Sequence, residues 1–202
     1  MEWTYVIAAI AAYLIGSLNG ALVIGKVMGV DIRTKGSGNA GATNAVRILG
    51  KKTGYIVFLL DFIKGILAVL AAKLIFDETE ASLAALFVVL GHVYPVYFGF
   101  KGGKGISTIV GVIAILDWRI FIFAAVWMIG MILITKIVSL STLSGVLGVT
   151  VLFAVLHWGD WVLIAVSALL TVITFVKHRA NIKRLLNGTE NKFGKKKQEK
   201  AE

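Results

Sequence analysis

The sequence has no cysteine, which excludes a disulfide framework, a cysteine-ligated metal site and a cysteine nucleophile. Proline occurs once, at Pro95, where it should kink or end a helix. Charged residues are also scarce, at 16% of the chain, whereas 58% of the residues are hydrophobic. This balance is more apolar than that of a typical soluble domain. It predicts an integral membrane protein.

Several chemistry-bearing motifs are missing as well. His92 is followed five residues later by Tyr97, so it forms no His-x4-Asp dyad, and His157 and Asp160 are too close together to form one. No cluster of acidic residues suggests a magnesium site, and no serine has an evident local base. The two halves of the chain lack the matching broken helices of an inverted-repeat transporter. We therefore predict neither a metal nor a cofactor.

Apolar runs near the length of a bilayer span, about 20 residues, follow one another along the chain. They predict an all-α, polytopic transmembrane helical bundle of about seven spans, with six as the main alternative. The fourth run is short, and it begins inside the glycine-rich segment before it or is partly re-entrant. We expect residues 1–191 to form a single domain and the lysine-rich composition of residues 192–202 to give a basic, disordered tail. The runs are Trp3–Val27, Gly54–Phe76, Ala81–Phe100, Gly105–Leu116, Ile120–Thr135, Leu140–Leu156 and Trp161–Val176.

The charge distribution predicts the orientation of this bundle. Of the 21 lysines and arginines, only Lys64, Lys73 and Arg119 fall outside the predicted inner segments. This bias follows the positive-inside rule, with the N-terminus outside and the C-terminus in the cytoplasm. Glu2 precedes the first run and Lys26 lies at its far end, which is the reverse of a secretory signal. Topology therefore accounts for the formal charge of +10 without nucleic acid.

The first inner loop alternates glycines with small polar residues and ends at Arg47. Glycine lets backbone N–H groups converge on an anion, and Thr43 or Asn44 is a suitable helix N-cap, which would point a helix dipole at that anion. Arg47 adds a forked phosphate donor. A flexible loop is the alternative, but the polar residues on a basic face favour phosphate binding. The candidates in this loop are Gly36, Ser37, Gly38, Asn39, Gly41, Thr43, Asn44 and Arg47.

A second glycine-rich segment follows Pro95. Lys101 and Lys104 flank the pair Gly102–Gly103, which forms a second candidate anion nest. The segment lacks the spacing of a P-loop, so no nucleotide is predicted. An equally weighted alternative is a positive-inside anchor with a turn.

Three ionisable residues lie inside predicted spans. His92 sits in an apolar run, where a lone histidine is most often buried and satisfied, although an intramembrane ionisable residue is a functional candidate by default. Asp61 and Lys64 are three residues apart and can pair on one helix face. A structural ion pair, supporting the loop residues from behind, is favoured over a catalytic role.

Two further inner segments carry polar side chains. Ser139, Ser141 and Thr142 cluster at a predicted helix start, where capping is favoured and substrate binding is compatible. The segment from Lys177 to Glu190 reads as a short interfacial helix that Gly188 stops. His178 and Asn181 share one face of it. Basic residues at a membrane edge explain its lysines and arginines, but not this His–Asn pair.

These four segments together resemble the bacterial acyl-phosphate:glycerol-3-phosphate acyltransferase family. The resemblance rests on Gly-Ser-Gly-Asn-x-Gly-Ala-Thr-Asn-x-x-Arg and Lys-Gly-Gly-Lys-Gly, and it extends over nearly the whole chain. It implies transfer of an acyl group from acyl phosphate to the 1-hydroxyl of sn-glycerol 3-phosphate, which forms lysophosphatidic acid and phosphate as the first step of phospholipid synthesis. The implied location is the bacterial inner membrane, with the active site facing the cytoplasm. One departure is Ser-Leu-Ser-Thr at residues 139–142, where the family pattern is Ser-Leu-Ala-Ser.

The resemblance also implies roles for residues. Ser37, Arg47, Lys104, His178 and Asn181 are the predicted catalytic residues. His178 is the best protein base, because histidine titrates near neutrality, although the donor's phosphate is an alternative proton acceptor. The remaining substrate-binding candidates are Gly36, Gly38, Asn39, Gly41, Thr43, Asn44, His92, Lys101, Gly102, Gly103, Ser139, Thr142, Arg184 and Glu190.

Two other classes of protein compete with the enzyme. A transporter of a phosphorylated metabolite would place polar groups near the midplane of the membrane, whereas most of them cluster at one surface here. A lipid-binding scaffold would not need the glycine-spaced Asn, Thr and His residues. The expected partners are the two substrates and the bilayer, and the oligomeric state stays open, a monomer included.

Overall fold

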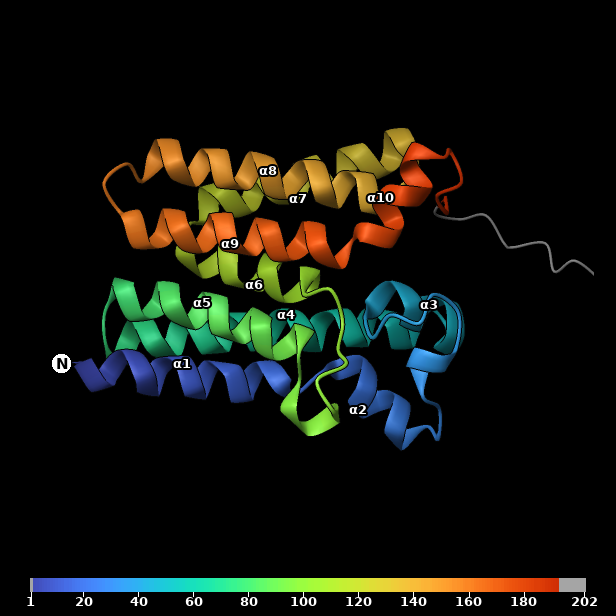
Figure 1. Ribbon diagram of the computed structural model, residues 1–202, viewed down its shortest axis with the longest axis horizontal. Helices are drawn as coiled ribbons and strands as arrows, with labels where there is room; N and C mark the ends of the chain where they lie inside the picture. Colours follow the sequence, from blue (N-terminus) through green and yellow to red (C-terminus); the bar gives the residue numbers. More distant parts are fainter. Residues whose placement is uncertain (1, 193–202) are drawn as a thin grey trace, which may run out of the picture.

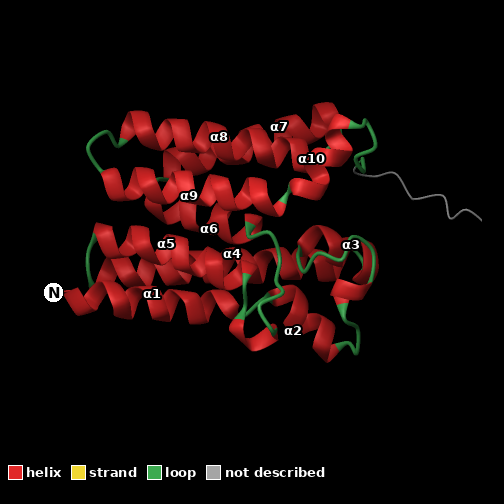
Figure 2. Cartoon of the chain, viewed as in Figure 1, coloured by secondary structure: helices red, strands yellow, loops and turns green. Residues whose placement is uncertain are grey.

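A computed structural model describes residues 2–192 of the chain. These residues form helices and connecting loops without a β-strand (Figure 2), as predicted for the all-α class. The predicted tail, apart from Lys192, lies outside the described residues. The helices are α1 (Glu2–Ser17), α2 (Gly20–Val27), η1 (Ile32–Thr34), α3 (Ala42–Leu49), α4 (Lys51–Ile75), α5 (Glu78–Val93), η2 (Val96–Phe98), α6 (Ile106–Leu116), α7 (Trp118–Thr135), α8 (Val138–Leu156), α9 (Trp161–Lys177) and α10 (Arg179–Leu186), η being 3₁₀ turns.

The long helices lie side by side along one axis of the molecule (Figure 1). Helix α1 packs on α5, α4 packs on both α5 and α6, and α9 joins α5 to the α7–α8 pair through its contacts with α5 and α8. The short helices α2, α3 and α10 all lie at the end of the bundle opposite the N-terminus (Figure 1). Loops from distant parts of the sequence therefore meet at that end.

The number of membrane spans stays a prediction. Five segments of the described chain are long and apolar enough to cross a bilayer, and the bent pair α9–α10 raises the number to six. Helix α6, which is the predicted short fourth run, has only 11 residues. At the usual rise it is about 16 Å long, well short of a hydrocarbon core of about 30 Å.

The first apolar run was predicted to be one helix, but it forms two, α1 and α2. The interruption falls at Leu18 and Asn19, where Asn19 becomes the N-cap of α2 and its side chain accepts a hydrogen bond from the Leu22 N–H at 3.1 Å. The high apolar content of the flanking residues hid this cap in the sequence. The helix therefore ends and restarts next to the polar loops instead of running through to them.

Glycines let the helices of the bundle approach closely. A Cβ atom built on Gly91 of α5 would lie 2.2 Å from the carbonyl oxygen of Tyr13, and one on Gly16 of α1 would lie 2.1 Å from that of Val88. Small residues at such contacts are typical of helix packing in membranes. Together these two glycines explain the extensive contact between α1 and α5.

Replacement of Gly91 by alanine is therefore expected to destabilise the bundle. Overpacking of this kind costs about 1–3 kcal/mol, which should appear as unfolding at a lower SDS fraction in mixed micelles. The matched control is Gly130→Ala in α7, because a Cβ there meets nothing within 4 Å. An equal loss of stability in both variants would contradict close packing at Gly91.

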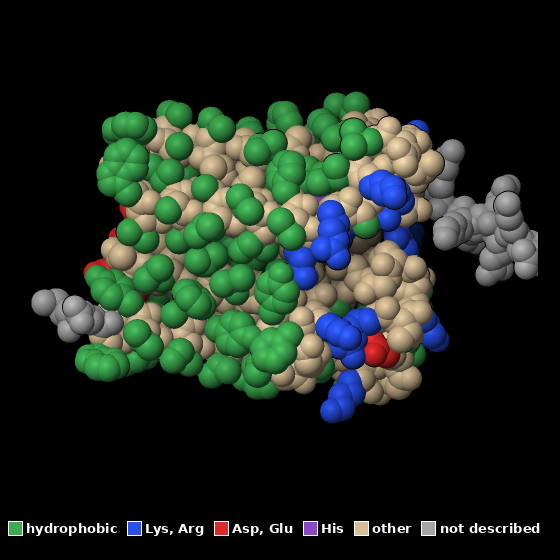
Figure 3. All heavy atoms as spheres, viewed as in Figure 1, with side chains coloured by type: hydrophobic (Ala, Val, Ile, Leu, Met, Phe, Trp, Pro, Cys, Tyr) green, Lys and Arg blue, Asp and Glu red, His purple; other side chains and the backbone are tan. Residues whose placement is uncertain are grey.

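Basic residues gather at the end of the bundle that carries α2 and α10, whereas apolar side chains cover the face toward the other end (Figure 3). We call the end with α2, α3 and α10 the basic end. This distribution matches the charge bias in the sequence, and the orientation of the bundle in a membrane stays a prediction.

A polar cluster that sequence reasoning missed lies at the opposite end. The Asp117 carboxylate caps α7 and pairs with the Arg119 guanidinium at 2.6 Å and with the Nε2 atom of His157 at 2.9 Å. The hydrogen bond from Arg119, followed by that from His157, holds the pKa of the Asp117 carboxyl well below its usual range. His157 therefore pairs with Asp117, 40 residues away in the sequence, and no local spacing around Asp160 indicated this contact.

Candidate functional site

The loop before α3 is clamped by the buried side chain of Asn44, which is 1% exposed. Its Oδ1 atom accepts the Ser37 N–H at 2.9 Å, and its Nδ2 atom donates to the carbonyls of Ile32 and Lys35, both at 3.0 Å. The Asn44 amide is thus engaged by the loop backbone. Asn44 therefore holds the backbone of the loop together, while Ser37 stays exposed.

The prediction that Thr43 or Asn44 caps α3 is wrong. The N-cap is Gly41, without a side-chain hydrogen bond, because Asn44 lies within the first turn and its side chain turns back to the loop. Gly36 has a positive φ of 63°, and a Cβ there would lie 2.3 Å from Asn44 Oδ1. The clamp therefore requires glycine at this position. Further predicted members of this loop are Gly38, with φ 71°, the half-buried Asn39, and the exposed Thr43 and Arg47.

The glycine pair before Lys104 is packed tightly against the end of α5. The N–H groups of Gly102 and Gly103 donate to the carbonyls of Val93 and His92, each at 3.2 Å. A Cβ on Gly103 would lie 2.3 Å from both the Ala40 carbonyl oxygen and His92 Nε2. These two amides are thus used within the fold, and the second anion nest cannot be built from them. Lys101 is exposed beside them.

Lys104 reaches the predicted C-terminal segment. Its Nζ atom donates to Asn181 Oδ1, and Asn181 Nδ2 donates to Glu190 Oε1 at 2.8 Å. Arg184 Nε donates to the other carboxylate oxygen of Glu190 at 2.7 Å. A bend of 63° separates α9 from α10, which carries Asn181 and Arg184, and the helix ends before Gly188 as predicted. The chain Lys104–Asn181–Glu190–Arg184 therefore links two of the four predicted segments.

The charges around Lys104 extend this group to a third segment. The pKa of the Lys104 ammonium is lowered to about 8, mainly by burial; Glu190 opposes the shift, and the positive charges of Arg184 and Arg47 add to it. Arg47 of α3 is thus close enough for its charge to be felt at Lys104. An anion bound between these cations would relieve their mutual repulsion.

His178 lies at the bend between α9 and α10 and is 4% exposed. Its Nδ1 atom is 2.8 Å from the Thr174 carbonyl oxygen, which can only accept, so Nδ1 carries the proton and Nε2 is the free acceptor. Burial, with the positive charge of Lys104 next, lowers the pKa of His178 to about 4. The imidazole is therefore neutral at physiological pH.

The hydroxyl cluster of α8 was predicted to cap the helix, and this prediction is wrong. The N-cap is Ile137, which makes no side-chain hydrogen bond. Ser141 and Thr142 instead donate to the carbonyls of Ile137 and Val138 within the helix, both at 2.9 Å. The buried Ser139 hydroxyl has no hydrogen-bond partner among the described residues. Helix α8 contacts α10, so Ser139 remains a binding candidate.

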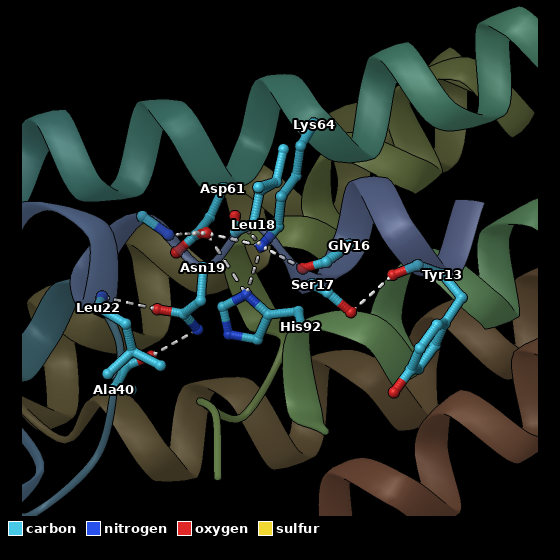
Figure 4. A network of polar contacts seen from close by, with 11 residues as sticks. Tyr13, Gly16, Ser17, Leu18, Asn19, Leu22, Ala40, Asp61, Lys64 and His92 are labelled. Atoms are coloured by element: carbon cyan, nitrogen blue, oxygen red, sulfur yellow. Dashed lines mark hydrogen bonds and ion pairs between the residues drawn. The ribbon is translucent and has the colours of Figure 1, made fainter. Parts of the chain in front are cut away.

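The predicted ion pair of α4 is present and includes a third residue. Lys64 Nζ lies 2.9 Å from Asp61 Oδ1 and 3.0 Å from His92 Nδ1, and all three side chains are buried. Figure 4 shows them pointing toward one another, with residues of the α1–α2 break around them. His92, a predicted binding residue, thus faces this network, which we call the buried triad.

The structure therefore brings together most of the predicted catalytic residues at the basic end. Three cationic side chains, one carboxylate, one amide and one neutral imidazole form what we call the Lys104 cluster: Arg47, Lys104, His178, Asn181, Arg184 and Glu190. Such a set can bind a doubly charged anion such as a phosphate monoester. Asn44, His92, Gly102 and Gly103 lie in the supporting structure instead.

Comparisons with known proteins show the family of the chain. The profile of a family described as "Glycerol-3-phosphate acyltransferase" matches residues 6–188. A glycerol-3-phosphate acyltransferase of Thermoanaerobacter sp. (strain X514) is 43% identical over 192 residues, covering 95% of this chain and 96% of that protein. One of Clostridioides difficile (strain 630) is 43% identical over 203 residues, covering 97% and 98%.

Two solved structures share the fold. Both are crystal structures of PlsY (YgiH), described as an integral membrane glycerol 3-phosphate acyltransferase. The glycerol 3-phosphate form has a TM-score of 0.89 at 40% identity, covering 94% of this chain and 96% of that one. The lysophosphatidic acid form has a TM-score of 0.86 at 39% identity, covering 94% and 95%. The chain described here therefore belongs to the glycerol-3-phosphate acyltransferase family.

Proposed function

We propose that this protein transfers a fatty acyl group from acyl phosphate to the 1-hydroxyl of sn-glycerol 3-phosphate. The observation that carries the proposal is the Lys104 cluster, in which the charges of Arg47 and Arg184 act on Lys104 and Arg184 pairs with Glu190 at the basic end. Both proposed substrates carry a phosphate, and the solved relatives are described with glycerol 3-phosphate and with lysophosphatidic acid. These would be the acceptor and the product here.

The proposed reaction needs little help from a protein nucleophile. The glycerol hydroxyl oxygen attacks the acyl carbon, an ester C–O bond forms, and the bond from the acyl carbon to the phosphate oxygen breaks. Inorganic phosphate leaves and takes up the hydroxyl proton. Because acyl phosphate is already activated, positioning and charge stabilisation by Arg47 and Lys104 would supply most of the acceleration.

The donor is tested by offering acyl phosphate, acyl-CoA and acyl-carrier protein separately to the purified protein in lipid. Lysophosphatidic acid should form with acyl phosphate alone. Formation from either thioester at an equal rate would contradict this choice of donor. A transporter is not carried forward, because the family to which the chain belongs is one of acyltransferases.

The proposed location is the bacterial inner membrane, with the basic end in the cytoplasm. The positive-inside bias supports this orientation. Since the chain has no cysteine, the variants Lys52→Cys and Trp158→Cys can be labelled in intact cells with a membrane-impermeant maleimide. Labelling at position 158 alone fits the proposal, and labelling at position 52 alone would reverse the orientation.

His178 is expected not to be the general base. With a pKa lowered to about 4, its neutral ring is a weak proton acceptor, and the donor phosphate is the better one. The variant His178→Gln should therefore keep turnover within about tenfold of wild type, and activity should show no transition near pH 6.5. A general base contributes about 10²–10⁴-fold, so a loss of that size in a folded Gln variant would identify His178 as the base.

The alkaline limit of activity is expected near pH 8. Lys104 has a pKa lowered to about 8, so its cation is present below that pH and is lost as the pH rises through it. Activity that depends on this cation should fall over the same interval. In Lys104→Arg the fall should move beyond about pH 10, because guanidinium stays protonated. Profiles of kcat/KM from pH 6 to 10 measure this, and a fall near 8 in both enzymes would assign it to another group.

A further inference from the structure

The buried triad of Asp61, Lys64 and His92 takes up the backbone groups that the α1–α2 break leaves free. In an unbroken helix the Gly20 N–H would donate to the Gly16 carbonyl. Here the Gly20 N–H donates to Asp61 Oδ1 at 3.1 Å, and Lys64 Nζ donates to the Gly16 carbonyl at 2.8 Å. Lys64 also donates to the Leu18 carbonyl, at 3.0 Å. The triad therefore holds the helix break in place.

The break is connected directly to the first glycine loop. Asn19, the residue at the break, uses its Nδ2 atom to donate to the Ala40 carbonyl at 3.2 Å, and it is fully buried. Ala40 lies three residues after Ser37 in the clamped loop. A change at the break would thus be transmitted to the loop that carries Ser37 and leads into the helix of Arg47.

His92 connects the same triad to the second loop. Its Nδ1 atom faces Lys64, whereas its Nε2 atom and its backbone carbonyl face Gly103, the residue before Lys104. Because Lys64 can only donate, Nδ1 accepts. Gly103 in turn lies against the Ala40 carbonyl, so close that a Cβ would lie 2.3 Å from it. The two loops therefore meet at a junction of Ala40 and Gly103, and the His92 ring lies behind it.

We propose that Asp61, Lys64 and His92 are positioning residues, which set the spacing between the Ser37–Arg47 segment and Lys104 by fixing the Ala40–Gly103 junction. The inference rests on the proposed function, because this spacing matters if phosphate groups bind between these segments. The triad itself is buried behind the loops. An apolar core would stabilise the bundle equally well, so the buried charges are explained by the geometry that they impose.

The variant that tests this is His92→Asn. The shorter amide keeps an acceptor near the Nδ1 position for Lys64 and removes the Nε2 edge that lies against Gly103. Lys64→Met is less suitable, because it leaves the Asp61 carboxylate buried without its cation and is expected to impair folding. The matched control is His157→Asn at the opposite end, which removes the bond to Asp117.

His92→Asn is expected to raise the KM of at least one phosphate substrate roughly tenfold while the protein stays folded, since a displaced Lys104 would make a weaker charged hydrogen bond to the phosphate. A mere loss of folded enzyme would lower the maximal rate without raising KM. In addition, Lys104 should become more solvated, so the alkaline fall of activity should move from near pH 8 toward the usual range of lysine. The control should change neither KM nor this fall.

A titration of Lys104 by NMR with 13C-labelled lysine measures the same shift without any turnover. A higher pKa of Lys104 in His92→Asn but not in His157→Asn supports the positioning role, whether or not acyl transfer is observed. The absence of acyl transfer would contradict the proposed function instead. Wild-type KM values and an unshifted Lys104 titration in folded His92→Asn would overturn the inference. Equal shifts in both variants would overturn it too, because they would show a general loosening of the bundle.

Discussion

Replacement of Lys104 by methionine is expected to lower kcat/KM by about 10²–10³-fold, the usual effect of losing one stabilising donor from an active site. Lys104 is the half-buried cation to which the other members of its cluster are arranged. It donates to Asn181, and its pKa responds to Glu190, Arg184 and Arg47. Methionine keeps the length and the apolar stem of the side chain, so the loss isolates the charge.

The control for this variant is Lys183→Met. Lys183 is exposed on α10, next to Arg184 in the sequence but outside the hydrogen-bonded chain. Its replacement should change kcat/KM by no more than about twofold, as surface substitutions generally do. A folded Lys104→Met enzyme with activity close to that of this control would remove Lys104 from the site.

Arg47 is expected to be the second residue whose loss is severe. Its charge is felt at Lys104 from α3, so the pair can hold one anion from two sides. Arg47→Met should lower kcat/KM by about 10²–10³-fold. Arg47→Lys should lose roughly tenfold, because an ammonium keeps the charge but not the forked pair of donors. The control is Lys51→Met, at the exposed start of the next helix.

Comparison of Arg47→Lys with Arg47→Met shows whether Arg47 binds the anion through its forked pair of donors or only through its charge. If Arg47→Lys equals wild type, Arg47 acts as a point charge, and the forked contact is excluded. If Arg47→Met also equals wild type, the residue has no part in binding, whatever its distance from Lys104. Both outcomes are measured in the same assay that defines the loss at Lys104.

Patterns with one physical cause were predicted well from the sequence. The apolar runs correspond to helices of the bundle, α5 ends two residues before Pro95, and Gly188 follows the end of α10. The ion pair of Asp61 and Lys64 follows from helical spacing alone. Only the family resemblance placed Lys104 and Asn181 in the same site, because no local pattern relates positions so far apart in the sequence.

Features that depend on tertiary contacts were missed. Asn19 interrupts a run that is apolar on both sides, and its role requires the triad, which joins α4 to α5. Asn44 reads as a cap or a ligand, yet its amide is taken up by carbonyls of its own loop. The pair Gly102–Gly103 reads as an anion nest but packs against His92 and Ala40. In each case an alternative partner, invisible in the sequence, satisfies the polar group.

The central claim is that the Lys104 cluster at the basic end of the bundle transfers an acyl group between two phosphate compounds. Its most direct test is to mix the purified protein in lipid with acyl phosphate and glycerol 3-phosphate and to measure both products. We predict that lysophosphatidic acid and inorganic phosphate appear in equal amounts, and that Lys104→Met forms neither at a comparable rate. Absence of lysophosphatidic acid with acyl phosphate, acyl-CoA and acyl-carrier protein alike would contradict the account.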